Sequence, residues 1–172
     1  MTYGATAIKK GRQLARTDMP IDYTVTFDLY PKGKVNGWAN IIHFSATGGN
    51  CCSYGDRVPA IWFYSRSTRF HMIDGHAKVG NDECTISQQL PLNKRTAVVI
   101  EHLPTKCNVY FNNKKMCTEA RADRKQFREA QVWAADPWHN VAAAKMDNLL
   151  IRSARAMSPP PPPPPPAKKA TL

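Results

Sequence analysis

The sequence predicts an all-β domain in which two antiparallel sheets stack face to face, with little helix. Three observations carry this prediction: apolar and polar residues alternate along short segments, turn residues separate the segments, and no long apolar run interrupts them. The longest apolar runs have four or five residues, as at 97–100, far below the roughly 20 that cross a bilayer. We therefore expect one domain of the 172 residues and no membrane span.

The first predicted strand covers residues 23–29, where every second residue is apolar, and Pro31 ends it. Further strands, bounded by turn residues, are predicted at 38–44, 60–64, 69–73, 96–101, 108–111, 130–134 and 149–151. Their spacing of about 10 to 20 residues is typical of a sandwich and not of alternating strands and helices. The best helix candidate, 119–128, is polar nearly all round apart from Phe127, so a helix there would bury little apolar surface.

The net charge of +11 is concentrated towards the two ends of the chain. Residues 1–20 carry +3 and residues 151–172 carry +4. Charge held in arms does not make a shaped basic face, so no nucleic-acid partner is expected. We predict a basic N-terminal arm at 1–20, a sandwich domain at 21–153 and a polyproline II tail at 154–172.

The tail contains eight consecutive prolines, Pro159–Pro166, between Ser158 and Ala167. At ~3.1 Å per residue they would form a polyproline II rod of about 25 Å. Such a rod acts as a spacer or as the ligand of an aromatic groove. The flanking residues pick out no particular recognition domain, which favours the spacer.

Three stretches go beyond generic strand patterning. They read Asn-Gly-Trp-Ala-Asn-Ile-Ile-His-Phe at 36–44, Gly-Asp-Arg-Val-Pro-Ala-Ile-Trp-Phe at 55–63, and Trp-Ala-Ala-Asp-Pro-Trp at 133–138, followed by Asn-Leu-Leu-Ile at 148–151. In this order and spacing, the chain from 21 to 152 resembles the concanavalin A-like, laminin-G-like jelly rolls. That superfamily includes lectins, adhesion modules, polysaccharide-cleaving enzymes and structural domains, so the resemblance implies a fold more than a function.

The resemblance implies a frame for the strands. An inner strand at 38–44 would deliver Trp38, Ile42 and Phe44 to the core, and 60–64 would be its neighbour. The segments 96–101 and 108–111 would form a middle pair, and the closing strand at 148–151 would pair near the N-terminal one.

The chain has five cysteines, at positions 51, 52, 84, 107 and 117. An odd number leaves one unpaired or bonded to another molecule if the rest form bridges. Cys84 and the adjacent Cys51 and Cys52 lie in predicted loops, so a bridge from Cys84 to one of them is the candidate disulfide in an oxidising compartment. The alternative is that all five are reduced, buried apolar side chains.

The predicted hairpin bears on the remaining two cysteines. A four-residue loop at 112–115 would set Tyr110 opposite Cys117 and Cys107 opposite Ala120. Cys107 and Cys117 would then point to opposite faces of the sheet, and a bridge between them would need a bulge or a slipped register.

The sequence argues against an enzyme. A glycosidase of this fold needs paired carboxylates, and none of Glu83, Glu101, Glu119 and Glu129 has an acid two residues away. The histidines have no spacing typical of a metal site or a catalytic triad, and no Cys-x-x-Cys pair occurs. We predict no cofactor and no metal. Calcium is the one alternative weighed, through the loop acids Asp56, Asp82 and Asp136, each of which is as easily a turn former.

A recognition surface is the better hypothesis. The predicted loops offer Asn50, Tyr54, Asp56, Trp138 and His139 for stacking on sugar rings and bonding to hydroxyls, although Trp138 is as easily a cap on the core. We therefore predict a non-catalytic recognition or adhesion module of a cell surface or extracellular structure, which binds glycan or a protein neighbour through loops at the sandwich rim.

The alternative function is a structural accessory subunit of a large assembly, with the basic arm and the tail threading onto neighbouring chains. No secretory signal is recognisable at the start of the sequence. An extracellular location is expected if such a signal is missing from this sequence, and an intracellular organelle assembly otherwise.

Overall fold

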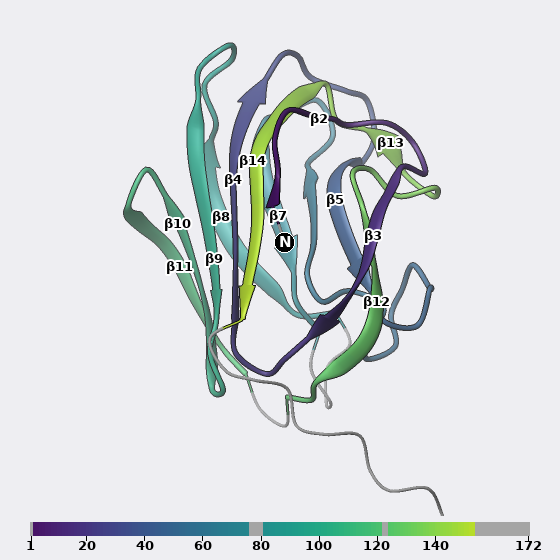
Figure 1. Ribbon diagram of the computed structural model, residues 1–172. Coiled ribbons are helices and arrows are strands. Elements are labelled where there is room, and N and C mark those ends of the chain that lie inside the picture. The colour runs from purple at the N-terminus through teal and green to yellow at the C-terminus, as the bar shows by residue number, and fades with distance from the viewer. Residues whose placement is uncertain (1, 76–80, 122–123, 154–172) are drawn as a thin grey trace, which may run out of the picture.

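The computed structural model is a β-sandwich of two seven-stranded sheets, as the sequence predicts (Figure 1). It describes residues 2–75, 81–121 and 124–153. No helix occurs in these residues, so none of their segments could cross a bilayer as a helix. The predicted tail, 154–172, lies outside the described residues.

The first sheet, called here the β4 sheet, is antiparallel throughout. Its strand order is β1 (Thr2–Tyr3), β14 (Ala144–Ser153), β4 (Tyr23–Pro31), β9 (Thr96–His102), β10 (Lys106–Phe111) and β11 (Lys114–Ala120), and β2 (Thr6–Ala7) also pairs with β14. The pairing of β14 with β4 confirms that the closing strand lies beside the N-terminal one. The pairing of β9 with β10 confirms the predicted middle pair.

The second sheet, called here the β6 sheet, carries the candidate site. Its order is β3 (Gln13–Met19), β12 (Phe127–Trp133), β5 (Ala39–Ser45), β6 (Ala60–Phe63), β7 (Arg69–Ile73) and β8 (Glu83–Gln89), and β13 (Asn140–Val141) pairs with β5 in parallel. The neighbours β5 and β6 confirm another pairing that the resemblance implies.

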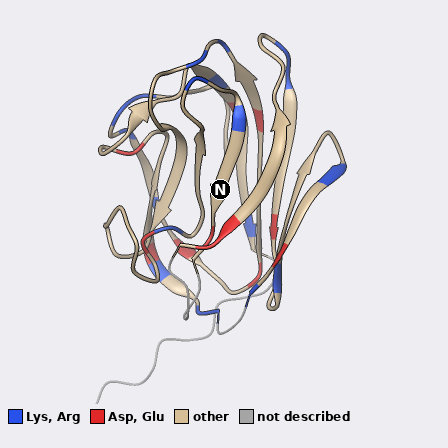
Figure 2. Ribbon diagram, turned by 180° about the vertical axis from the view of Figure 1, so that it is seen from behind, with Lys and Arg blue, Asp and Glu red and all other residues tan. Residues whose placement is uncertain are grey.

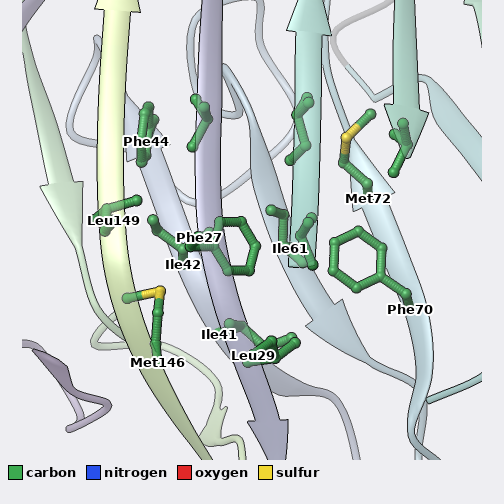
Figure 3. Packing of buried hydrophobic residues seen from close by; sticks show 14 of the residues in the cluster. Phe27, Leu29, Ile41, Ile42, Phe44, Ile61, Phe70, Met72, Met146 and Leu149 are labelled. Atoms are coloured by element: carbon green, nitrogen blue, oxygen red, sulfur yellow. The ribbon is translucent and has the colours of Figure 1, made fainter. Parts of the chain in front are cut away.

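One large apolar core fills the space between the sheets (Figure 3). Its side chains come from both sheets and include Phe27, Leu29, Met146, Leu149, Ile41, Ile42, Phe44, Ile61, Phe70 and Met72. The alternating residues of β4, Tyr23 to Leu29, are each at most 2% exposed, which confirms the period-two pattern. Trp38 was expected in this core, but it lies just before β5 with 43% of its surface exposed.

Residues 2–19 contribute more structure than an arm. β1 and β2 pair with β14, and β3 forms an edge strand beside β12. Only Met19 of β3 is fully buried, so the strand has a weak apolar pattern. In the view of Figure 2, Lys and Arg occur on strands and loops of both sheets.

The helix candidate at 119–128 forms no helix in its described residues. β11 ends at Ala120 and β12 begins at Phe127, while Arg121 and Arg124 between them form ion pairs with the buried carboxylate of Asp74. Without an apolar stripe, the segment gains more from these contacts than from a helix on the surface.

The predicted hairpin register is also wrong. Asn112 and Asn113 have φ values of 48° and 67°, so they form a two-residue turn of the kind that favours asparagine. A bulge in the β10–β11 pairing then sets Cys117 opposite Val109. Cys117 therefore points to the same face of the sheet as Val109 and Cys107.

The cysteines pair differently from the prediction. Cys84 of β8 bonds to Cys117 of β11, with Cα atoms 6.1 Å apart, and so ties the edge strands of the two sheets together. Cys51 and Cys52 bond to each other in the loop between β5 and β6. Cys84 therefore bridges to neither of them: it lies in strand β8 and not in a loop, and its partner is on the facing edge strand β11. Cys107 is a buried free thiol.

Candidate functional site

The outer face of the β6 sheet is unusually aromatic for a solvent-facing surface. Ile61, Phe63 and Phe70 point into the core, so the alternating residues Trp62 and His71 point outward. These two are cross-strand partners, and Glu83 follows on β8 opposite Ile73. The strand pairing thus brings together residues that are far apart in the sequence.

Two adjoining pockets lie on this face. The first has a volume of ≈ 420 Å³, and its lining combines aromatic rings with polar groups: Trp38, Trp62, Tyr64, His71, His139, Arg57, Asn81 and Glu83. The second, of ≈ 500 Å³, shares Trp38 and Tyr64 with it and adds Ser65, Ser67, Arg69, Ser87 and Gln89. We refer to the two pockets together as the outer groove.

Trp38 is the exposed platform of the outer groove. Its ring centroid lies 4.7 Å from those of both Tyr64 and His71, which hold the indole in place. The guanidinium of Arg69 lies over the Tyr64 ring, 3.6 Å from its centroid. The result is a large, preorganised apolar surface between the two pockets.

Glu83 supplies a negative charge to the first pocket. Tyr64 Oη and His71 Nδ1 both donate hydrogen bonds to its carboxylate, the second at 2.9 Å. Partial burial opposes ionisation, but these hydrogen bonds lower the pKa of Glu83 below its ordinary value. Burial is also the main cause that lowers the pKa of His71, so the ring is neutral at pH 7 and its Nδ1–H donates.

Arg57 supplies the positive charge of the same pocket. Its Nε donates to the carbonyl of Asn50 at 2.8 Å, and another nitrogen donates to the Asn81 amide oxygen. The guanidinium lies 4.8 Å from the ring centroid of Trp62. Burial lowers the pKa of Arg57. Because a guanidinium group stays protonated in proteins, the pocket presents an oriented cation beside an indole.

Trp62 and His139 complete the pocket. The indole Nε1 of Trp62 is buried and has no hydrogen-bond acceptor among the described residues. His139 packs its ring edge-on against Trp62 at 5.2 Å. The carboxylate of Asp136 accepts hydrogen bonds from the backbone N–H and from Nδ1 of His139, both at 2.8 Å, and so fixes this ring. Burial raises the pKa of Asp136, but the hydrogen bonds from His139 and His43 outweigh burial and lower that pKa.

Of the five loop residues predicted as a site, His139 lines the outer groove. Trp138 lies beside it but packs on His43 and Trp133, 5.4 Å from each centroid, with 39% of its surface exposed. Asn50 contributes its carbonyl to Arg57 and no lining surface.

The other two predicted residues hold the loop between β5 and β6 in shape. Asp56 is buried and accepts hydrogen bonds from Thr47 and from the Ser53 amide. The hydroxyl of Tyr54 accepts from the Lys125 amide at 2.7 Å, and its ring packs on Phe127. Neither residue lines the pockets described above.

Sequence reasoning missed the central residues of the groove: Trp38, Trp62, Tyr64, His71 and Glu83. The signal that identifies Trp62 and Tyr64 is their position in the strand. If Ile61 and Phe63 face the core, these two aromatic residues must face outward.

The three acids weighed for calcium are engaged separately. Asp82 pairs with Arg121 at 3.0 Å, Asp136 holds His43 and His139, and Asp56 bonds within its loop. In the described part of the chain, the group of side chains close enough to share an ion is Asp74, His102 and Cys107. Two arginines already neutralise that carboxylate, which disfavours a cation there.

No protein-family model and no curated protein matches the chain. Solved structures do. Domain 4 of the extracellular GH43 arabinanase AbnA from Geobacillus stearothermophilus, in complex with arabinotriose, has a TM-score of 0.55 at 11% identity over 83% of this chain and 64% of that one. Carbohydrate-binding module CBM66 from Bacillus subtilis has a TM-score of 0.52 at 13% identity over 88% and 97%.

The sialidase of Trypanosoma rangeli is a third similar structure, with a TM-score of 0.57 at 10% identity over 88% of this chain. The chain spans 27% of the length of that sialidase and about two-thirds of the arabinanase domain chain. At these identities the likeness shows the fold alone. The chain thus shares its β-sandwich with carbohydrate-binding domains, which is consistent with the concanavalin A-like resemblance.

Proposed function

We propose that this domain is a non-catalytic glycan-binding module and that the outer groove is its binding surface. The observation that carries the proposal is the exposed indole of Trp38, which Tyr64 and His71 hold at the junction of two pockets. A sugar ring presents C–H groups to an aromatic face and hydroxyl groups at its edge. A fixed indole surrounded by polar groups matches both parts of that ligand.

The polar groups around Trp38 offer both kinds of hydrogen bond. The carboxylate of Glu83 accepts from sugar hydroxyls, while the guanidinium of Arg57 donates to them. The similarity to CBM66, which is a carbohydrate-binding module by name, supports the proposal.

The same lining supports a binding role and not hydrolysis. Hydrolysis by the common mechanism needs two carboxyl groups about 5 to 9.5 Å apart on either side of the scissile bond. Among the described residues that line the outer groove, Glu83 is the one carboxylate.

The disulfide Cys84–Cys117 is typical of oxidising compartments, so we propose an extracellular or surface location for this binding module.

A glycan microarray followed by calorimetry tests the proposal. The full chain is expected to bind at least one class of oligosaccharide at low salt, and Trp38→Ala should weaken that binding about 30-fold, as loss of a central aromatic anchor does. Trp138→Ala is the matched control, because this indole is similarly exposed but lies outside the groove. Absence of binding across the array, or equal loss in both variants, would contradict the proposal.

A further inference from the structure

We propose that this protein recognises acidic polysaccharide, and that a basic end of the sandwich binds the sulfate or carboxylate groups of a sugar chain that lies in the outer groove. This inference rests on the proposed glycan-binding function and specifies the class of glycan. Its three supports are the unbalanced charge of the second pocket, the exposed cations at one end of the sandwich, and the continuity of that end with the groove.

The two pockets of the groove differ in charge. The first contains both Arg57 and Glu83, so a cation and an anion offset each other there. In the second, Arg69 is the charged residue of the described lining, and the other groups are neutral hydroxyls, one amide and two aromatic rings. A guanidinium without a carboxylate in its own pocket binds sulfate and carboxylate groups well. The second pocket therefore suits an anionic substituent on a sugar that stacks on Trp38.

Exposed cations gather at the end of the sandwich where β4 ends, at the top of Figure 1. Three loops meet there, after β4, β6 and β8: 32–38, 64–68 and 90–95. The Arg66 amide donates to the carbonyl of Val35, and the Asn93 amide donates to the carbonyl of Pro31, the last residue of β4, both at 2.7 Å. We call four exposed side chains of these loops the basic end: Lys32, Lys34, Arg66 and Lys94.

The charge of the basic end is not neutralised within the described part of the chain, where no carboxylate forms an ion pair with it. The acids of the neighbouring strands have other partners, since Asp28 pairs with Arg95 and Asp147 pairs with Lys145, both at 2.7 Å. Like charges that lie together attract a polyanion, which binds them with release of its counterions. The basic end is thus suited to a chain that carries repeated negative charges.

The basic end continues directly into the second pocket. Arg66 lies between Ser65 and Ser67, both of which line that pocket. Its Nε donates to the side-chain oxygen of Asn36 at 3.2 Å, which fixes the cation beside the loop that leads to Trp38. A polysaccharide that stacks on Trp38 can therefore extend from the second pocket onto the basic end.

The groove favours a polysaccharide over other polyanions. The carboxylate of Glu83 accepts from sugar hydroxyls, whereas it repels the phosphate groups of a nucleic acid strand. A flat anionic membrane would contact the exposed loops but would leave the groove empty. The neutral groups of the second pocket bond to sugar hydroxyls as well as to sulfate: Ser65, Ser67, Ser87 and Gln89.

Pairs of polymers that differ in charge test the proposal. The full chain is titrated by interferometry against dextran sulfate and dextran, and against polygalacturonate and its methyl ester. We expect binding to dextran sulfate, to polygalacturonate or to both, which identifies sulfate, carboxylate or either group as the recognised charge. If four cations are engaged, the affinity should fall about 50-fold as the salt concentration rises from ~50 to ~200 mM.

Three outcomes of these titrations would overturn the proposal. The first is equal affinity within both pairs, and the second is no binding to either charged polymer. The third is tighter binding to a thymidine oligonucleotide or to phosphatidylserine vesicles than to either charged polysaccharide, which would assign the basic end to nucleic acid or membrane.

Variants with the same loss of charge locate the binding. One variant removes three cations of the basic end, by Lys32→Gln, Lys34→Gln and Lys94→Gln. Its matched control removes three exposed cations at the opposite end, by Lys106→Gln, Lys125→Gln and Arg152→Gln. The first variant should bind the charged polymer about tenfold more weakly, with a salt slope lower by about 2, and the control should bind as the native chain does. Thermal melts show that both are folded, and equal losses of affinity in the two would overturn the proposal.

Failure of this inference and failure of the proposed function give different results. If neutral glycans bind in a way that needs Trp38, while the charged polymers bind no better than their uncharged counterparts, the inference is wrong and glycan binding in the groove stands. If the charged polymers need the basic end but Trp38→Ala binds them as the native chain does, the groove is not the glycan site. In that case the proposed function of the groove is wrong, and recognition of acidic polysaccharide by the basic end stands.

Discussion

Two histidine–carboxylate pairs of this protein have almost the same local geometry and different surroundings. In the outer groove, His71 Nδ1 lies 2.9 Å from the carboxylate of Glu83, and the two side chains are 12% and 34% exposed. At the end of the sandwich, His102 Nδ1 lies 3.1 Å from the carboxylate of Asp74, and both are fully buried. The comparison shows that burial and neighbouring charges, more than the pair itself, determine its role.

The buried pair belongs to a larger ionic cluster. Arg124 contacts Asp74 at 2.9 Å and Arg121 contacts it at 3.4 Å, while Tyr23 stacks on His102 with centroids 4.0 Å apart. The contacts of this ionic cluster join β4, β9, the end of β7 and the segment between β11 and β12. Nothing of the Asp74 or His102 side chains is exposed to a ligand, so we assign this cluster to stability and the groove pair to binding.

The largest expected effect comes from breaking the buried cluster. Asp74→Asn leaves two buried guanidinium groups without their common anion, and removal of one partner from such a cluster costs about 3–5 kcal/mol. Urea denaturation should show this loss in the free energy of unfolding. A loss below about 1 kcal/mol, the range of exposed ion pairs, would show that the two regions do not differ as we argue.

The sequence predicts which strand residues form the apolar core of the sandwich, but not which residues form the outer groove. Alternation along 23–29 identifies the strand that faces the core, because one of its faces is polar. Residues 60–64 are apolar on both faces, so the pattern alone does not separate the inward Ile61 and Phe63 from the outward Trp62 and Tyr64.

The pairs of side chains were beyond sequence reasoning for a different reason. His71 and Glu83 meet because β7 pairs with β8, and β8 has a weak apolar pattern that predicts no strand. Loop composition favoured Asn50, Tyr54 and Asp56 as ligand groups, but the loop uses most of their polar atoms to hold itself together. Composition reports which polar groups are present, whereas tertiary contacts decide which remain free to bind.

The second prediction uses pH to separate the two histidines. Burial lowers the pKa of His102 from 6.5 to about 4, so the unfolded chain binds more protons than the native protein between these values. Stability should therefore fall as the pH drops from about 6.5 to about 4, by about 3 kcal/mol in total. Urea denaturation across this range measures the slope.

Variants identify the responsible group. His102→Gln should flatten the pH dependence between 4 and 6.5, while His71→Gln should retain most of it because His71 is partly exposed and its pKa is lowered less. If the slope persists in His102→Gln and disappears in His71→Gln, the assignment of the buried cluster to stability is wrong.

The smallest effect on stability is expected in the groove, where the effect on binding should be large. Glu83→Gln keeps an oxygen that accepts from Tyr64 and His71, and the group is about one-third exposed, so the free energy of unfolding should change by about 1 kcal/mol or less. Loss of the charge weakens each hydrogen bond from a sugar hydroxyl, which should reduce glycan affinity about tenfold. Calorimetry with the glycan found on the array measures this affinity. His102→Gln leaves the groove intact and should bind the glycan as the native chain does.

The opposite outcome for Glu83→Gln would contradict the comparison. If this variant loses several kcal/mol of stability but its folded fraction binds glycan with native affinity, then the exposed pair is a structural element like its buried counterpart.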